Sequence, residues 1–154
     1  MTVEEGAQAP DFTMPTDGGG EVSLSALKGQ NVVLYFYPRD DTKGCTTEAN
    51  DFTARADAFK DLNTVVIGVS KDSVASHEKF KKKHAIGFAL ASDENGNVCE
   101  DYGVWKEKNM YGKTYMGIER STFLIDSSGT VRKVWRKVKV PSHAEAVLDA
   151  VKAL

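Results

Sequence analysis

The residue of this chain best suited to covalent chemistry is Cys45, one of its two cysteines. It stands at the expected start of a helix from about Cys45 to Lys60, where free backbone N–H groups favour an anion such as a thiolate. Its neighbours are polar, with Asp-Asp-Thr-Lys-Gly before it and Thr-Thr-Glu after it. Such neighbours favour a reactive thiol over a cysteine that only fills space in a core.

Two residues just before Cys45 suit the same chemistry. Thr42 lies three positions earlier and can direct its hydroxyl at the thiolate or at a substrate oxygen. Gly44 has no side chain, which lets the backbone come close to whatever the sulfur attacks. The segment therefore has the composition that a nucleophilic cysteine requires.

The elements that position Cys45 follow from the apolar pattern. The continuous apolar run 32–37 ends at Pro38 and predicts a strand buried on both faces. Further expected elements are an N-terminal hairpin with its turn at 17–20, a strand at 64–70, a helix at 73–84, a short strand at 88–90, a short helix at 98–102, a long loop at 103–117, a hairpin over 120–140, and a final helix capped by Ser142 and ending at Ala153.

This order of elements predicts the fold class. Strands separated by helices early in the chain, followed by a hairpin, indicate a mixed central sheet with helices on both faces. We expect an α/β three-layer sandwich of the thioredoxin-like kind with an N-terminal β-hairpin. The 154 residues fit one domain, over residues 1–154.

Composition excludes several other classes of function. A net charge of −2 and a pI near 5.9 give no reason to expect nucleic acid or an acidic membrane surface as a partner. The start of the chain lacks the apolar core of a signal peptide, so we expect a cytoplasmic protein. His77, His84 and His143 show no zinc spacing and are interpreted as structural or surface residues. We expect no metal and no cofactor.

The segment 36–49 resembles the active-site segment of peroxiredoxins, with its Pro-x-x-x-Thr-x-x-Cys pattern from Pro38 to Cys45. It is most similar to the bacterioferritin comigratory protein, or Q-type, branch. The likeness extends over the whole chain, through the segments Ala-Pro-Asp-Phe at 9–12, Gly-Val-Trp at 103–105, Gly-Lys-Thr at 112–114 and 117–126.

The resemblance implies a thiol-dependent peroxidase that reduces hydrogen peroxide and organic hydroperoxides. Cys45 would attack the peroxide as a thiolate and become a sulfenic acid. Thr42 would hydrogen-bond the sulfur and the peroxide, Pro38 would shield the pocket from water, and Arg120 would stabilise the thiolate and the developing charge. Glu48, one turn into the helix, is a further candidate that would orient Arg120, or else an exposed carboxylate.

The sequence departs from many relatives at the resolving cysteine. Five residues after Cys45 stands Asn50, and no cysteine lies near Lys81, the other position that relatives use. Cys99 is the only other thiol, and either a structural role or a resolving role is open to it. We therefore expect a one-cysteine cycle in which thioredoxin, glutaredoxin or a low-molecular-weight thiol reduces Cys45, in a monomer or weak dimer with no nucleic-acid or membrane partner.

Two other functions compete with this interpretation. A thioredoxin-like disulfide oxidoreductase would need Cys-x-x-Cys, but Thr42 and Glu48 occupy the positions three residues either side of Cys45. A redox sensor or chaperone-like protein would use the same thiol with little turnover. Steady-state consumption of peroxide separates turnover from a single stoichiometric burst.

Overall fold

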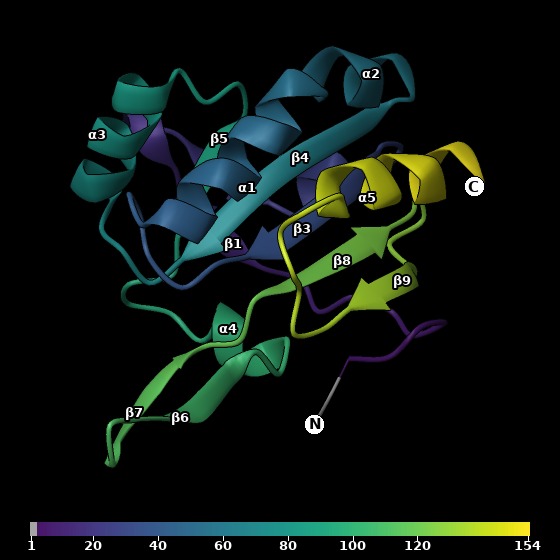
Figure 1. Cartoon of the computed structure of the whole chain (residues 1–154). Coiled ribbons are helices and arrows are strands. Elements are labelled where there is room, and N and C mark those ends of the chain that lie inside the picture. The colour runs from purple at the N-terminus through teal and green to yellow at the C-terminus, as the bar shows by residue number, and fades with distance from the viewer. Residues whose placement is uncertain (1–2) are drawn as a thin grey trace.

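The computed structural model describes residues 3–154, with a five-stranded mixed sheet at its centre (Figure 1). The strand order is β5-β4-β3-β8-β9. β3 is parallel to β4 and antiparallel to β8, β4 is parallel to β5, and β8 is antiparallel to β9. The bounds are β3 Asn31–Phe36, β4 Thr64–Ser70, β5 Ala89–Ser92, β8 Ser121–Ile125 and β9 Val131–Trp135. The mixed sheet confirms the predicted fold class.

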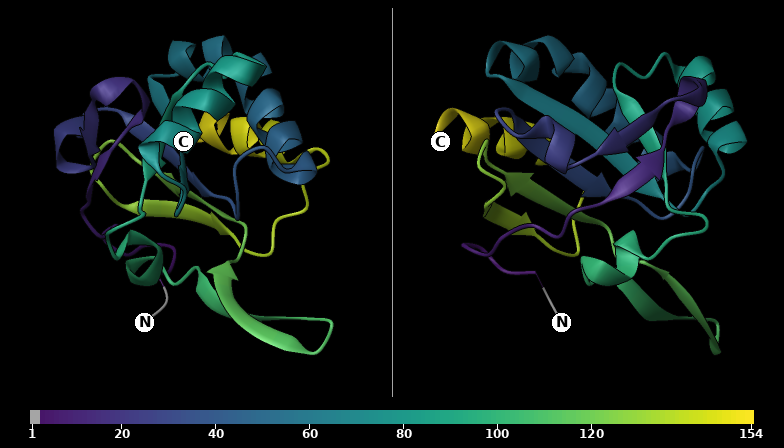
Figure 2. Two further views of the ribbon diagram at one scale, coloured as in Figure 1. Left: turned by 90° about the vertical axis from the view of Figure 1, so that its left-hand side faces the viewer. Right: turned by 180° about the vertical axis from the view of Figure 1, so that it is seen from behind.

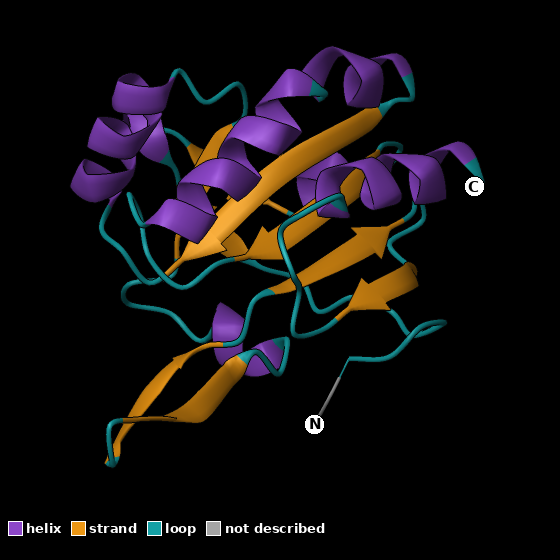
Figure 3. Ribbon diagram, viewed as in Figure 1, coloured by secondary structure: helices purple, strands orange, loops and turns teal. Residues whose placement is uncertain are grey.

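One face of this sheet is covered by helices α1, α2 and α5, with Phe80 of α3 packed into the same core (Figures 1 and 3). Because side chains alternate along a strand, β3 sends Val33 and Tyr35 to this face. The apolar sides of α1 and α5 close over them and exclude water. The helices are α1 Lys43–Ala54, α2 Ala56–Asp61, α3 Val74–His84 and α5 His143–Lys152.

The opposite face carries the other residues of β3, which are Val32, Leu34 and Phe36. It is covered by the N-terminal hairpin and by the short helix α4, which Figure 2 shows from behind. The hairpin consists of β1 Thr13–Pro15 and β2 Glu21–Ser23, and α4 spans Val98–Asp101. Two short 3₁₀ turns flank β2, η1 at Asp17–Gly19 and η2 at Ser25–Leu27. The sheet therefore separates two cores.

Three expectations about local structure are wrong. The predicted loop at 103–117 is instead a hairpin of β6 Trp105–Met110 and β7 Lys113–Ile118, which extends away from the rest of the chain (Figure 2). The expected helix from Cys45 to Lys60 is broken at Arg55, whose ψ of 7° departs from helical geometry. Ser142 lies at the start of α5, but its side chain makes no capping hydrogen bond.

Other expected boundaries agree with the structure. Thr64–Ser70 is the strand β4, and the Ser73 hydroxyl accepts a hydrogen bond from the Ser76 N–H at the start of α3, as a helix cap should. No helix within residues 3–154 is long and apolar enough to cross a membrane.

Candidate active site

Cys45 lies in the first turn of α1, just beyond the carboxyl end of β3. Thr42 is the N-cap residue, and the first helical hydrogen bond runs from the Thr46 N–H to the Thr42 carbonyl. The backbone N–H groups ahead of Thr46 therefore lack helical partners and give this end of α1 a partial positive charge. The Cys45 side chain is buried against the helix-covered face, with 2% of its surface exposed.

Arg120 reaches this point because of the register between β3 and β8. Phe36, the last residue of β3, pairs with Ser121, the first residue of β8. Arg120 therefore lies beside the end of β3, where the loop to α1 begins. Its backbone is fixed there, because its carbonyl accepts a hydrogen bond from the Val138 N–H at 2.9 Å.

The Arg120 guanidinium joins two side chains of α1. Nη2 donates to Cys45 Sγ at 3.3 Å, and Nη1 donates to Glu48 Oε1 at 2.6 Å. Gly44 makes room for this arrangement, since a Cβ at that position would lie 3.2 Å from Nη2. One rigid planar fork can hold both partners, which the single ammonium of a lysine cannot do in the same way.

Glu48 is buried, contrary to the alternative of an exposed carboxylate, and only 1% of its surface is exposed. Burial raises the pKa of Glu48 to about 7, although the bond to Arg120 opposes this rise. Its second oxygen, Oε2, has no hydrogen-bond partner among the described residues. Glu48 therefore exchanges a proton near neutral pH, and in its ionised form it makes an ion pair with Arg120 that lies mostly out of water.

Thr42 and Pro38 lie in the segment that leads from β3 into α1, but the hydrogen bond of Thr42 differs from the expected one. The Thr42 hydroxyl donates to the Arg39 carbonyl at 3.0 Å, in place of the expected hydrogen bond with the sulfur. Its oxygen therefore remains free to accept a hydrogen bond. Pro38 follows β3 and is half-buried, at the start of the loop that leads to α1.

Cys99 lies far from this arrangement in the fold. It belongs to the core on the other face of the sheet, so the five strands lie between it and the core that holds Cys45. It is fully buried, and burial, with the nearby Asp93 carboxylate, raises the pKa of its thiol well above the ordinary value. Both cysteines are free thiols. Cys99 therefore has neither the position nor the ionisation of a partner for Cys45 in this conformation.

Two of the three histidines are buried, which sequence reasoning left open. His143 contacts Thr122 Oγ1 through Nε2 at 2.8 Å, and burial, aided by the positive charge of Arg120, lowers its pKa to about 4. His77 contacts Asp40 in the loop before α1 at 2.7 Å. Sequence reasoning missed Asp40, and the only signal for it was the acidic pair Asp40-Asp41 just ahead of the Cys45 segment.

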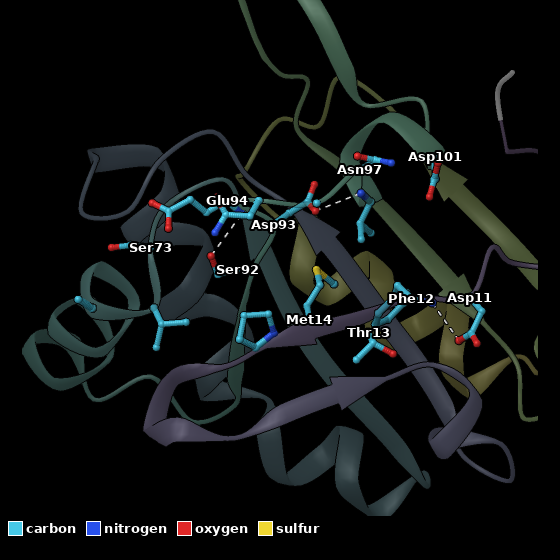
Figure 4. Close-up of a pocket in the computed structure, with 16 residues that line it drawn as sticks. Asp11, Phe12, Thr13, Met14, Ser73, Ser92, Asp93, Glu94, Asn97 and Asp101 are labelled. Atoms are coloured by element: carbon cyan, nitrogen blue, oxygen red, sulfur yellow. Dashed lines mark hydrogen bonds between the residues drawn. The ribbon is translucent and has the colours of Figure 1, made fainter.

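One cavity lies away from Cys45. It has a volume of about 640 Å³ and lies between β1 and the segment 92–98, as Figure 4 shows. Its walls include Met14 and Val98, which belong to the core on the face opposite Cys45. Neither cysteine is among the described residues that line it, so we assign it no part in thiol chemistry.

Comparison with known proteins gives a consistent result. Residues 6–134 match the AhpC/TSA family. A peroxiredoxin Bcp from Bacillus subtilis is 51% identical over 99% of this chain and 97% of its own length. A structure of the bacterioferritin comigratory protein of Xanthomonas campestris, studied for its alkyl peroxide reduction activity, has a TM-score of 0.88 and 48% identity, covering 92% of this chain and 90% of that one. A structure of Xylella fastidiosa PrxQ has a TM-score of 0.94 and 40% identity, covering 99% and 98%.

Proposed function

This chain belongs to the AhpC/TSA family and is a peroxiredoxin of the Bcp branch. We propose that it uses a one-cysteine catalytic cycle centred on Cys45, because Asn50 stands where many relatives carry the resolving cysteine. Enzymes of this family reduce peroxides at the expense of thiols. The observation that carries the assignment of Cys45 is its hydrogen bond with Arg120, whose Nη2 lies 3.3 Å from Cys45 Sγ.

In the first half of the cycle, the Cys45 thiolate attacks the terminal oxygen of a hydroperoxide. An S–O bond forms and the O–O bond breaks, so that Cys45 becomes a sulfenic acid, and the alkoxide or hydroxide that leaves takes up a proton from solvent to become the alcohol or water. Arg120 and the start of α1 stabilise the negative charge that moves from sulfur to oxygen. The free lone pairs of Thr42 accept a hydrogen bond from the peroxide, and Pro38 limits the access of water. Glu48 holds the guanidinium in place.

In the second half, an external thiol attacks the sulfenic sulfur, releases water and leaves a mixed disulfide. A second thiol then regenerates Cys45 and releases the oxidised reductant as a disulfide. Thioredoxin, glutaredoxin and a low-molecular-weight thiol all supply the required chemistry. Cys99 stays a structural thiol, which its burial on the other side of the sheet supports. The setting we propose is a single domain over 1–154, acting in the cytoplasm as a monomer or weak dimer.

The test is steady-state consumption of hydrogen peroxide with a thioredoxin system, in wild type and in Cys99→Ser. We expect both proteins to turn over at similar rates, because Cys99 takes no part. If Cys99→Ser keeps the first oxidation step but loses thioredoxin-linked turnover, the one-cysteine cycle is wrong. A single stoichiometric burst with every thiol reductant would instead favour the redox sensor or chaperone-like function.

A further inference from the structure

The loop between β3 and α1 is fastened to helix α3 by a buried polar cluster, made by Tyr37, Asp40, Ser76 and His77. The Tyr37 hydroxyl donates to Asp40 Oδ1 at 2.6 Å, and the Ser76 hydroxyl donates to Asp40 Oδ2 at 2.8 Å. His77 Nδ1 lies 2.7 Å from the same Oδ2. His77 is fully buried and Asp40 nearly so. This cluster is separate from the contacts among Cys45, Glu48 and Arg120.

The ring of His77 is held on both sides. Its Nε2 lies 2.9 Å from the Ala91 carbonyl of β5, which can only accept, so Nε2 carries a hydrogen. Its Nδ1 faces Asp40 Oδ2 at 2.7 Å and the Tyr37 hydroxyl at 3.4 Å. His77 therefore joins α3 to the loop before α1 on one side and to the sheet on the other.

Spacing alone would also allow a metal ion at Asp40, Asp72 and His77, whose ligand atoms lie within 4.8 Å of one another. The hydrogen bonds argue against it. Asp72 Oδ2 already accepts from the Asp40 N–H at 2.8 Å and from the Ser70 hydroxyl at 2.7 Å. Both Asp40 oxygens, both His77 ring nitrogens and Asp72 Oδ2 are thus engaged with groups of the protein itself. We therefore interpret the cluster as a hydrogen-bonded network.

The loop that this cluster fastens is the segment that leads into α1. Asp40 is fixed by its side chain to His77 and by its N–H to Asp72, and Asp41 pairs with Lys83 and His84 at the far end of α3. Thr42 follows at once and caps α1. The first turn of α1, and Cys45 within it, therefore takes its position relative to Arg120 from α3.

We propose that His77 is a positioning residue for the peroxidase reaction, which acts through Asp40 to hold the start of α1 where Cys45 meets Arg120. The inference rests on the proposed role of Cys45. Loss of either member of the pair leaves a buried polar group without its partner, and the loop then relaxes away from α3. The consequence is a slower reaction of Cys45 with peroxide in a chain that is still folded.

The test compares the second-order rate constant for oxidation by hydrogen peroxide in His77→Gln, Asp40→Asn, the double variant and Ser73→Ala. We expect each single variant of the pair to be at least tenfold slower, because each alters the contact between His77 Nδ1 and Asp40 Oδ2 that joins α3 to the loop. The double variant should be no slower than the slower single variant. Ser73→Ala, which removes the capping bond of α3 without touching Asp40, should stay within twofold of wild type at a temperature where all are folded.

A second readout needs no variant of His77. In ¹⁵N NMR spectra, Asp40→Asn should change the chemical shift of His77 Nδ1, because this nitrogen contacts Asp40 Oδ2 in the wild type. The inference is overturned if His77→Gln and Asp40→Asn keep the wild-type rate, if Ser73→Ala is as slow as His77→Gln, or if Asp40→Asn leaves the His77 Nδ1 shift unchanged. If wild-type Cys45 itself is not oxidised, the proposed function fails instead.

Discussion

Cys45 and Glu48, three residues apart on α1, share one guanidinium, with Sγ 3.3 Å from Arg120 Nη2 and Oε1 2.6 Å from Arg120 Nη1. Two acidic groups thus depend on a single cation in a nearly buried site. The two side chains therefore compete for the hydrogen bonds of one guanidinium. This arrangement gives both the reaction and the stability of the chain a distinct dependence on Arg120 and on pH.

Replacing Arg120 removes the donor that meets the sulfur. We expect Arg120→Ala to slow the oxidation of Cys45 by hydrogen peroxide by about 100- to 1000-fold, the usual loss for one preorganised donor to developing charge. The rate constant of Arg120→Lys should lie between those of wild type and Arg120→Ala, because an ammonium keeps the positive charge but not the forked hydrogen bonding of the guanidinium. Rapid-mixing kinetics measure the rate constant. Arg132→Ala, which alters an exposed pair with Asp126, is the control and should leave it unchanged. A wild-type rate in Arg120→Ala would contradict the assignment.

In the proposed mechanism Thr42 offers lone pairs to the peroxide, because its own proton is donated to the Arg39 carbonyl. Thr42→Val keeps the shape of the side chain and removes the hydroxyl, so we expect the rate of Cys45 oxidation to fall about tenfold, the equivalent of one hydrogen bond. Thr42→Ser keeps the hydroxyl, so its rate of Cys45 oxidation should fall much less. Equal rates in the valine and serine variants would show that the hydroxyl does not contact the peroxide.

Glu48 makes folding stability fall as pH rises through a defined window. Its pKa is 4.5 in an ordinary setting and about 7 in the fold, so between these values the folded chain holds a proton that the unfolded chain releases. The stabilisation is complete below about pH 4.5 and is lost by about pH 7. We expect Glu48→Gln to gain about 1–3 kcal/mol relative to wild type between pH 5 and pH 8 in urea unfolding. Glu107→Gln, at an exposed site on β6, is the control. A difference that does not change with pH would contradict this.

His143 affects the pH dependence of folding stability in the direction opposite to Glu48, because it makes stability fall as pH falls. Burial lowers its pKa from 6.5 to about 4, so between these values the unfolded chain binds a proton that the folded chain does not. Its contribution is complete above about pH 6.5 and is lost as pH falls toward 4. We expect His143→Asn to lose less stability than wild type on acidification over this range, again in urea unfolding. Parallel curves for the two proteins would show that His143 does not titrate as its surroundings require.

The sequence indicated the fold class and the position of Cys45 because both depend on local patterns. The run 32–37 is apolar without interruption, and Cys45 follows it at the start of a helix. The hairpin of β6 and β7 escaped detection because both of its faces are largely exposed, which leaves little apolar alternation to find. The break at Arg55 is equally invisible in the helical pattern.

The partner of Cys45 could not be predicted from local patterns. Arg120 stands 75 residues further along the chain, and only the antiparallel register of Phe36 with Ser121 brings it to α1. The family resemblance assigned Arg120 to Cys45, whereas only the structure shows that Glu48 is buried. The pairing of Asp40 with His77 could not be predicted from local patterns either, because it depends on where α3 packs.

The most direct test of this account is to oxidise the reduced protein with one equivalent of hydrogen peroxide, trap sulfenic acid with dimedone, and map the adduct by mass spectrometry in wild type and Arg120→Ala. The account predicts rapid modification of wild-type chains at Cys45 alone, with Cys99 still a free thiol, and slow modification in the variant. Adducts on Cys99, a disulfide joining Cys99 to Cys45, or equally rapid modification in both proteins would contradict it.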